Sequence, residues 1–173
     1  MKNKSEQGFT LIELLIVVAI ISIIAAIAVP GLLRARMTGN ETSAIASLKV
    51  TTSSQVAYSA SCGNGAYAAT YVILGTAPAP GGEGFISKDL GSVAAPQKSG
   101  YNFTLGAGAG SAAGPVDCNA VATITAFYAT GIPQTYATTG TRSFAVNAGN
   151  TIWQLTGAAA PTEPFGAPAT PIQ

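Results

Sequence analysis

The chain has 173 residues, and because about 150 residues is a typical domain size, its length predicts one folded domain and an N-terminal segment. Charged residues make up only 9% of the chain, the formal net charge is +1, and histidine is absent. This composition argues against a nucleic-acid-binding surface, which needs clustered Lys and Arg, and against nucleophilic catalytic sites that depend on His.

A long apolar run follows the first eight residues. Residues 9–29 are nearly all apolar and directly precede Pro30. At about 1.5 Å per residue, a helix of this length extends for about 32 Å and can cross the hydrocarbon core of a membrane. The exception is Glu13, whose carboxylate would cost roughly 2.5 to 3.5 kcal/mol at the membrane centre unless a cation compensates it.

A cut between Gly8 and Phe9 would create such a cation. The new α-amine would be positively charged at neutral pH and would lie four helical residues from Glu13, about 6 Å along the axis. The short leader before the cut is polar and basic, with Lys2 and Lys4. The amine and the carboxylate would then neutralise each other, within one subunit or between neighbouring subunits.

The sequence Gly8-Phe9-Thr10-Leu11-Ile12-Glu13, followed by an unbroken apolar run, resembles the class III signal peptide of type IV prepilins and of their relatives, the pseudopilins. The resemblance covers about the first 30 residues. It implies that a membrane-embedded prepilin peptidase, which is also a methyltransferase, cuts after Gly8 and N-methylates Phe9. It also implies that Glu13 pairs with a neighbour's N-terminus during assembly.

Three other interpretations of the apolar run stay open. A conventional secretory signal would have its apolar core before the cut, and Ala26-Ile27-Ala28 imitates its cleavage site, but this run is longer than a typical signal core. A plain membrane anchor has no use for Glu13. A buried core helix is seldom this long.

The helix is predicted to continue past Pro30, which we expect to kink it without ending it. From Leu32 onward the pattern predicts an amphipathic helix that lies against a sheet. Its apolar residues, at spacings of roughly three and four, are Leu33, Met37, Ala44, Ile45, Leu48 and Val56. A dense turn signal over residues 62–65 predicts the helix end near Ala60. The expected segments are therefore a leader (1–8), a transmembrane helix (9–29) and its amphipathic continuation (30–61).

The remaining residues are predicted to form the connection and the sheet of the fold. Residues 62–100 are predicted to form an irregular loop with a short helix around 67–74. Residues 101–173 are predicted to form a β-sheet head with an extended, Pro-rich tail from 161. Strands are expected over 101–105 and 121–128, and in a hairpin of 142–146 with 151–155. The predicted fold class is α+β and type IV pilin-like, with the long N-terminal helix packed on a small antiparallel sheet of about four strands.

The two cysteines, Cys62 and Cys118, lie in the part of the chain that would be exported. In an oxidising compartment they are expected to form a disulfide, which the chain-entropy account values at on the order of 4 kcal/mol. Two buried free thiols are the alternative. Two cysteines without histidine do not predict a zinc site.

No pattern in the chain predicts catalysis. The glycine-rich run at 106–110 overlaps a nucleotide-binding pattern, but no Lys-Ser/Thr closes it, which favours a flexible loop beside a strand. The acids Glu83, Asp89 and Asp117 are scattered, as solvated surface groups are, and the segment around Asp117 lacks the neighbouring carboxylates of a calcium loop. We therefore expect no enzymatic activity, no metal site and no cofactor.

The resemblance implies a structural subunit of a type IV pilus-like surface filament. Such a subunit is a single-pass membrane protein with its head outside the cytoplasm before assembly, and part of a helical homo-oligomer at the cell surface afterwards. The implied partners are the membrane, the prepilin peptidase/methyltransferase, and an assembly platform with its ATPases, without nucleic acid.

Two alternatives to the pilus subunit are kept. One is a pseudopilin of a type II secretion system, whose relatives usually carry an acidic calcium-binding loop near the C-terminus, where this chain has only Glu163. The other is a membrane-anchored binding domain that never polymerises.

Overall fold

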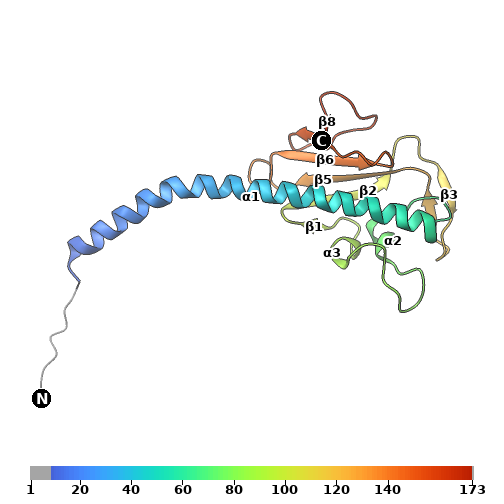
Figure 1. The fold of residues 1–173 in the computed structure, drawn as a ribbon, viewed down its shortest axis with the longest axis horizontal. Helices are drawn as coiled ribbons and strands as arrows, with labels where there is room; N and C mark the ends of the chain where they lie inside the picture. Colours follow the sequence, from blue (N-terminus) through green and yellow to red (C-terminus); the bar gives the residue numbers. More distant parts are fainter. Residues whose placement is uncertain (1–8, 173) are drawn as a thin grey trace, which may run out of the picture. The chain divides into compact units, whose positions relative to one another are not determined.

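The computed structural model describes residues 9–172 (Figure 1). The chain divides into two compact units, one up to Arg36 and one from Met37 onward. The first unit contains the front of a long helix. The second contains the rear of that helix and every described strand.

Three helices are described: α1 (Leu11–Ser61), α2 (Tyr71–Gly75) and α3 (Lys88–Gly91). α1 passes through Pro30 without ending, as predicted, since a proline removes only one of the many backbone donors of a long helix. It ends one residue beyond Ala60. There the amide groups of Cys62 and Gly63 both donate to the Tyr58 carbonyl, at 2.9 and 2.8 Å, which satisfies an acceptor of the last turn.

Within residues 9–172, eight strands form two antiparallel sheets, the larger ordered β1-β2-β5-β6-β7-β8 and the smaller β3-β4. The strands are β1 (Gln97–Lys98), β2 (Tyr101–Ala107), β3 (Ala113–Val116), β4 (Ala122–Ile124), β5 (Phe127–Pro133), β6 (Arg142–Asn147), β7 (Trp153–Thr156) and β8 (Thr170–Pro171). The α+β class is confirmed, but the main sheet has more than the four predicted strands. The strands that were missed are very short or, like β3, contain Gly and Pro, which weaken a strand pattern.

The predicted strand over residues 121–128 is wrong, because this segment belongs to two sheets. β4 pairs with β3, whereas β5 pairs with β2 from Phe127 onward. Between them, the Thr125 amide donates to the Ala112 carbonyl at 3.0 Å and the Ala126 amide donates to Ser111 Oγ at 3.1 Å. A continuous β-branched and aromatic run carries no signal for the point at which a chain changes sheets.

The predicted hairpin of β6 and β7 is confirmed. The two strands pair antiparallel from Arg142 opposite Thr156 to Ala145 opposite Trp153. In the turn between them, the Asn150 amide donates to the Asn147 carbonyl at 3.0 Å. Asn150 has a φ of 61°, a left-handed conformation that Asn tolerates better than most residues.

The core of the second unit lies between the rear of α1 and one face of the larger sheet. Leu48 and Tyr58 from α1 and Phe103, Phe127 and Phe144 from the sheet are buried together. Burial of each such side chain stabilises the fold by about 1.5 to 3 kcal/mol. Figure 1 shows the rear of α1 running along β2, β5 and β6.

The buried face of α1 differs from the predicted apolar face. Ala44 and Leu48 are buried as expected, but Val56 is 51% exposed. Polar residues occupy most of the other buried positions: Glu41, Ser47, Thr51, Thr52, Ser54 and Gln55. Hydrophobic periodicity was a poor guide here, because hydrogen-bonded polar groups take the place of apolar ones on the packed face.

The segment between α1 and the first strand is held together by glycines. A Cβ on Gly75 would lie 2.3 Å from the Gly91 carbonyl oxygen, and a Cβ on Gly84 would lie 2.3 Å from the Gly75 carbonyl oxygen. Only glycine allows these three stretches of backbone to approach so closely. The predicted short helix is present as α2, shifted towards the C-terminus, and Tyr67 instead forms an isolated bridge with Ile124.

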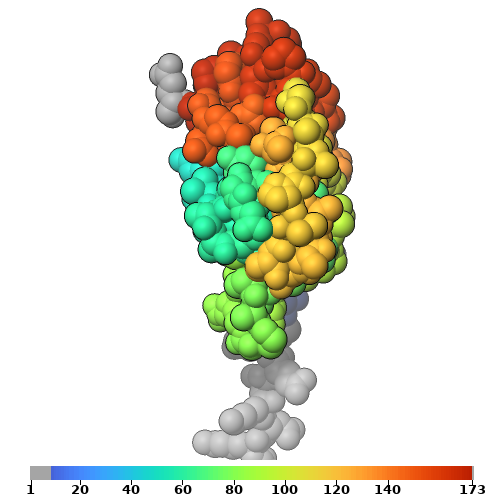
Figure 2. Space-filling model, turned by 90° about the vertical axis from the view of Figure 1, so that its right-hand side faces the viewer, coloured from blue at the N-terminus to red at the C-terminus, as the bar shows by residue number. Residues whose placement is uncertain are grey.

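The C-terminal segment covers part of the outer face of the sheet, and it appears as the red end of the chain in Figures 1 and 2. Phe165 stacks on Trp153 of β7, with ring centroids 5.4 Å apart. The Glu163 carboxylate accepts hydrogen bonds from Asn147 Nδ2 and the Ala109 amide, both at 2.6 Å. The glycine-rich loop predicted to be flexible is therefore tied to the tail at Ala109.

Candidate functional site

The front of α1 carries an apolar surface on all sides. Every large apolar side chain from Phe9 to Val29 is more than half exposed, from 51% at Val17 to 89% at Phe9. An 18-residue window of this helix has a mean hydropathy of 3.0, and its length and composition suffice to cross a membrane. A surface of this size requires lipid or other protein chains to cover it.

Glu13 lies in the first turn of α1 and completes a capping box with Thr10. Glu13 Oε2 accepts hydrogen bonds from the Thr10 amide at 2.9 Å and from Thr10 Oγ1 at 2.6 Å. In return, the Glu13 amide donates to Thr10 Oγ1 at 3.3 Å. The pattern Thr-x-x-Glu before an apolar run is a known helix start. Sequence reasoning missed this role, although the spacing was available to find it.

Two further polar features interrupt the apolar run. Ser22 Oγ donates to the Val18 carbonyl at 2.7 Å, so its hydroxyl is satisfied within the helix itself. Pro30 lies inside α1, one residue after the run. The kink predicted at Pro30 stays a prediction.

The structure describes only one side of the cleavage site predicted between Gly8 and Phe9. Gly8 and the leader lie outside the described residues, whereas Phe9 precedes the helix. The cleavage and N-methylation assigned to these residues therefore stay predictions, as does the assembly role of Glu13.

The predicted disulfide is present. Cys62 and Cys118 are bonded, with their Cα atoms 4.8 Å apart. Cys62 directly follows the last residue of α1, and Cys118 lies in the loop between β3 and β4. The bond therefore joins the end of the long helix covalently to the head.

A partly buried ion pair joins α1 to β6. Glu41, with a 7% exposed side chain, pairs with Arg142 Nη2 at 2.6 Å and also accepts a hydrogen bond from Arg142 Nε at 2.9 Å. Its other oxygen accepts from the Thr141 amide at 2.8 Å. Burial raises the pKa of Glu41, but the hydrogen bonds from Thr141 and Arg142 outweigh it and keep that pKa below its ordinary value.

A second buried carboxylate lies beside the disulfide. Asp117 accepts a hydrogen bond from Tyr58 Oη of α1 at 2.6 Å, and from the amides of Asn119 and Val121 at 2.8 Å. Burial raises the pKa of Asp117, and these three donors more than offset it, so that pKa lies below its ordinary value. Burial, together with the hydrogen bond to Asp117, raises the pKa of Tyr58.

Other side chains on the rear of α1 bond directly to the backbone of the head. Gln55 uses both ends of its amide, donating to the Ala68 carbonyl at 2.8 Å and accepting from the Ala68 amide at 2.9 Å. Ser54 Oγ donates to the Phe85 carbonyl at 2.8 Å. These polar groups are thus matched to fixed acceptors and donors on the head, which defines the register of α1 on it.

Two of the three scattered acids are engaged with other partners. Asp89 pairs with Lys98 at 2.6 Å, Asp117 bonds to Tyr58, and Glu83 lies on an exposed loop. Among residues 9–172, no three His, Cys, Asp or Glu side chains gather closely enough to hold a metal ion.

Two comparisons with known proteins give matches, each over only part of the chain. Residues 3–29 match the family model of the prokaryotic N-terminal methylation motif. The chain is also similar to the type IV wide pilus major component PilA4 of Thermus thermophilus, with 59% identity over 39 residues. That match covers 22% of this chain and only 30% of the relative. No solved structure matches the chain.

The methylation motif, matched over residues 3–29, coincides with the exposed apolar front of α1 and its capped Glu13. A disulfide-bonded head of α+β fold follows this helix. These features, together with the similarity to a pilus component, resemble those of type IV pilins.

Proposed function

We propose that this chain is the structural subunit of a type IV pilus-like surface filament. Its leader is removed between Gly8 and Phe9, Phe9 is N-methylated, and the processed subunits polymerise through the front of α1. The observation that carries the proposal is the front of α1, whose large apolar side chains up to Val29 are all exposed and whose acid, Glu13, lies in the first turn.

The driving force for polymerisation is burial of apolar helix surface. Apolar area removed from water contributes about 25 cal/mol per Å2, so an isolated front helix outside the membrane is strongly unfavourable. Relative to lipid the gain is much smaller, since lipid tails are equally apolar, and close packing and polar contacts must select the arrangement. Extraction from the membrane therefore needs external work, which we assign to an assembly platform and its ATPases.

Glu13 selects the register of the filament. In the single chain its Oε2 is already bonded to Thr10, which lowers the cost of carrying a carboxylate in an apolar helix. The Thr10 amide lies beyond the proposed cut, so the capping box persists in the processed subunit. The free α-amine of Phe9 in a neighbouring subunit then supplies the positive charge that neutralises the carboxylate.

Contacts between subunits of this kind do not close into a ring. Each helix front contacts different faces of its neighbours, which is a heterologous contact, and repeated heterologous contacts build a helical fibre. Before assembly the same helix anchors the subunit in the membrane, with the head outside the cytoplasm.

The test is electron microscopy of material sheared from the cell surface, combined with mass spectrometry of the subunit N-terminus. Fibres built of subunits that begin at N-methyl-Phe9 are the expected result. Processed protein found only in the membrane fraction would favour a pseudopilin of a secretion system. An unprocessed start at Met1 would contradict the proposal altogether.

A further inference from the structure

One carboxylate in the head has no partner. Among residues 9–172, every acidic side chain except Glu83 forms a hydrogen bond or an ion pair. The engaged acids are Glu13, Glu41, Asp89, Asp117 and Glu163. Glu83 lies in the exposed loop between α2 and α3, directly after Gly81 and Gly82. Its charge is therefore available to a group outside its own subunit.

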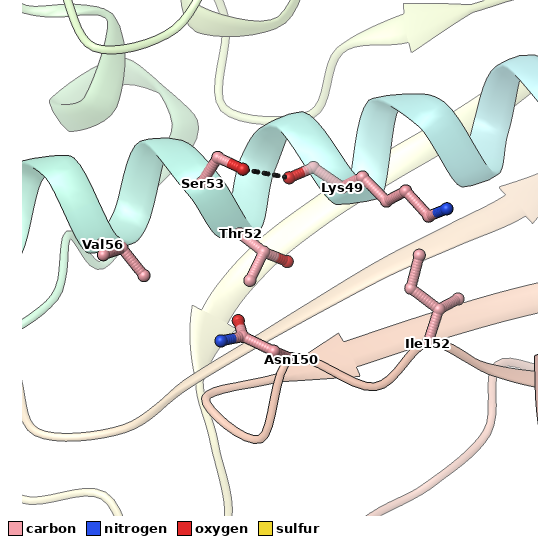
Figure 3. Close-up of a pocket in the computed structure, with 6 residues that line it drawn as sticks. All are labelled: Lys49, Thr52, Ser53, Val56, Asn150 and Ile152. Atoms are coloured by element: carbon pink, nitrogen blue, oxygen red, sulfur yellow. Dashed lines mark hydrogen bonds between the residues drawn. The ribbon is translucent and has the colours of Figure 1, made fainter.

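A groove on the same head offers a matching cation. It has a volume of about 510 Å3 and is lined by Lys49, Thr52, Ser53, Val56, Asn150 and Ile152 (Figure 3). The hydroxyl groups of Thr52 and Ser53 donate hydrogen bonds to backbone carbonyls of α1. The Lys49 ammonium and the Asn150 side-chain amide have no partner among the described residues. The groove therefore presents an apolar wall, a positive charge and an amide donor, which together suit a carboxylate on a short apolar loop.

The loop and the groove lie on opposite sides of the rear of α1. In Figure 1 the loop between α2 and α3 hangs below α1, whereas the β6–β7 turn that carries Asn150 lies above it. Figure 2 agrees, with the loop projecting at the bottom and the C-terminal strands at the top. Two unlike surfaces on opposite sides of one subunit are what a heterologous, repeating contact requires.

Lys88 is the other unpaired lysine of the head, but it is poorly placed for this contact. It lines the same hollow as Glu83, on the loop's own side of the molecule. An ion pair between Glu83 and Lys88 would add nothing to a contact between two subunits. Lys49 is the unpaired lysine on the opposite side.

We propose that a second copy of this chain occupies the groove, with Glu83 of one head bound to Lys49 and Asn150 of the next. The inference rests on the proposed function, because it needs subunits in a filament. It adds a head-to-head contact to the contact made by the front of α1. The residues of the loop before Glu83 (Ala77, Pro78, Ala79, Pro80, Gly81 and Gly82) are short and uncharged, so they can pack against Val56 and Ile152.

The test is position-specific crosslinking in filaments sheared from cells that carry the full-length chain. In the variant Lys49→Cys/Glu83→Cys, mild oxidation is expected to produce a ladder of disulfide-linked subunits on a non-reducing gel. Each single variant should stay monomeric. The matched control Lys88→Cys/Glu83→Cys, which uses the lysine on the loop's own side, should give no ladder between subunits.

A charge-reversal series provides a second readout that needs no added thiol. Lys49→Glu places two carboxylates opposite each other and should reduce the amount of sheared fibre roughly tenfold. Lys49→Glu/Glu83→Lys should restore it, whereas Lys88→Glu should leave the wild-type amount unchanged. All these side chains are exposed, so the head should fold in each variant.

The outcomes separate this inference from the function on which it rests. Wild-type cells without fibres would overturn the proposed function and, with it, this contact. Wild-type fibres with no ladder and no rescue by the double reversal would overturn the contact alone. If the cysteine variants form no fibres, the charge-reversal series tests the contact instead. Restored fibre in the double reversal would support the contact, and no restoration would overturn it.

Discussion

The front and the rear of α1 belong to one continuous helix but obtain their stability in opposite ways. The front is apolar on all sides and exposes its large side chains, from Leu11 to Val29, to whatever surrounds it. The rear buries a face that is mostly polar, and its side chains bond to fixed groups on the head, as Glu41 does to Arg142.

This difference assigns separate tasks to the two halves of the helix. A non-directional apolar surface can slide and rotate, so the front alone specifies no register. In the proposed filament, Glu13 would select one. Directional hydrogen bonds and an ion pair allow only one arrangement, so the rear has a single register on its own head. Polar contacts therefore determine the geometry of the rear, and in the proposed filament they would do the same for the front, with partners from other chains.

Substitution of Glu13 should have the largest effect and act only on the front. Glu13→Ala is expected to abolish surface fibres while export, leader cleavage and head stability stay normal, because the head makes no use of this residue. Fibre counts by electron microscopy and the mass of the processed subunit would measure these effects. Normal fibres from this variant would contradict the assembly role of Glu13.

Glu13→Gln separates the two roles of this side chain. Glutamine also completes a capping box, so the start of the helix is preserved, but it carries no charge. If the pair with the neighbour's amine is what assembly needs, this variant also fails to form fibres. Wild-type fibre counts would instead assign the role to the helix cap.

Loss of the disulfide should have the largest effect on the stability with which the rear of α1 and the head fold together. The bond closes a loop over a sequence separation of 56, and Cys62→Ser/Cys118→Ser should lower the free energy of unfolding by on the order of 4 kcal/mol. Urea unfolding of the full chain in detergent, followed by the fluorescence of Trp153, measures this. Wild-type protein treated with a reductant should unfold at the same urea concentration as the variant.

Breaking the partly buried ion pair between Glu41 and Arg142 should have a slightly smaller effect. Arg142→Met leaves the Glu41 carboxylate buried without its cation, which should cost about 3 kcal/mol in the same urea experiment. Lys98→Met is the matched control, because it breaks the exposed pair with Asp89 and should cost less than about 1 kcal/mol. Equal losses in the two variants would show that the rear of α1 does not depend on directional contacts.

The smallest predicted effect is a dependence on pH. Asp117 and Glu41 have folded-state pKa values below their ordinary range, so their stabilisation is complete above the unfolded-state pKa and is lost as the pH falls through the lower folded value. The melting temperature should therefore be steady from pH 7 to about 5 and fall below about pH 4. Asp117→Asn should make this fall in melting temperature shallower. If melting temperature falls equally steeply with pH in the variant, Asp117 does not contribute to the pH dependence.

The front of the molecule could be predicted from the sequence almost completely. A 21-residue apolar run indicates a long helix, and the pattern from Gly8 to Glu13 is specific enough to indicate a prepilin signal. The hairpin of β6 and β7 and the disulfide were also predictable, since alternation, a turn signal and paired cysteines are local or countable features. The capping box with Thr10 was equally local and was overlooked.

The rear of the helix and the head resisted prediction for a physical reason. Residues such as Gln55 and Glu41 look solvent-facing in a sequence, and only their distant partners, Ala68 and Arg142, justify their burial. The same holds for β8, whose two residues become a strand only because β7 is beside them. Features that depend on partners far away in the sequence leave no local pattern.

The covalent link at the end of α1 has a mechanical consequence. A filament under tension would pull on each subunit along this helix, and the rear of the helix would tend to peel from its head one hydrogen bond at a time. The bond from Cys62 to Cys118, placed immediately after Ser61, stops that peeling before the helix can leave the head. Reduction of this bond would therefore weaken the fibre most when it is stretched.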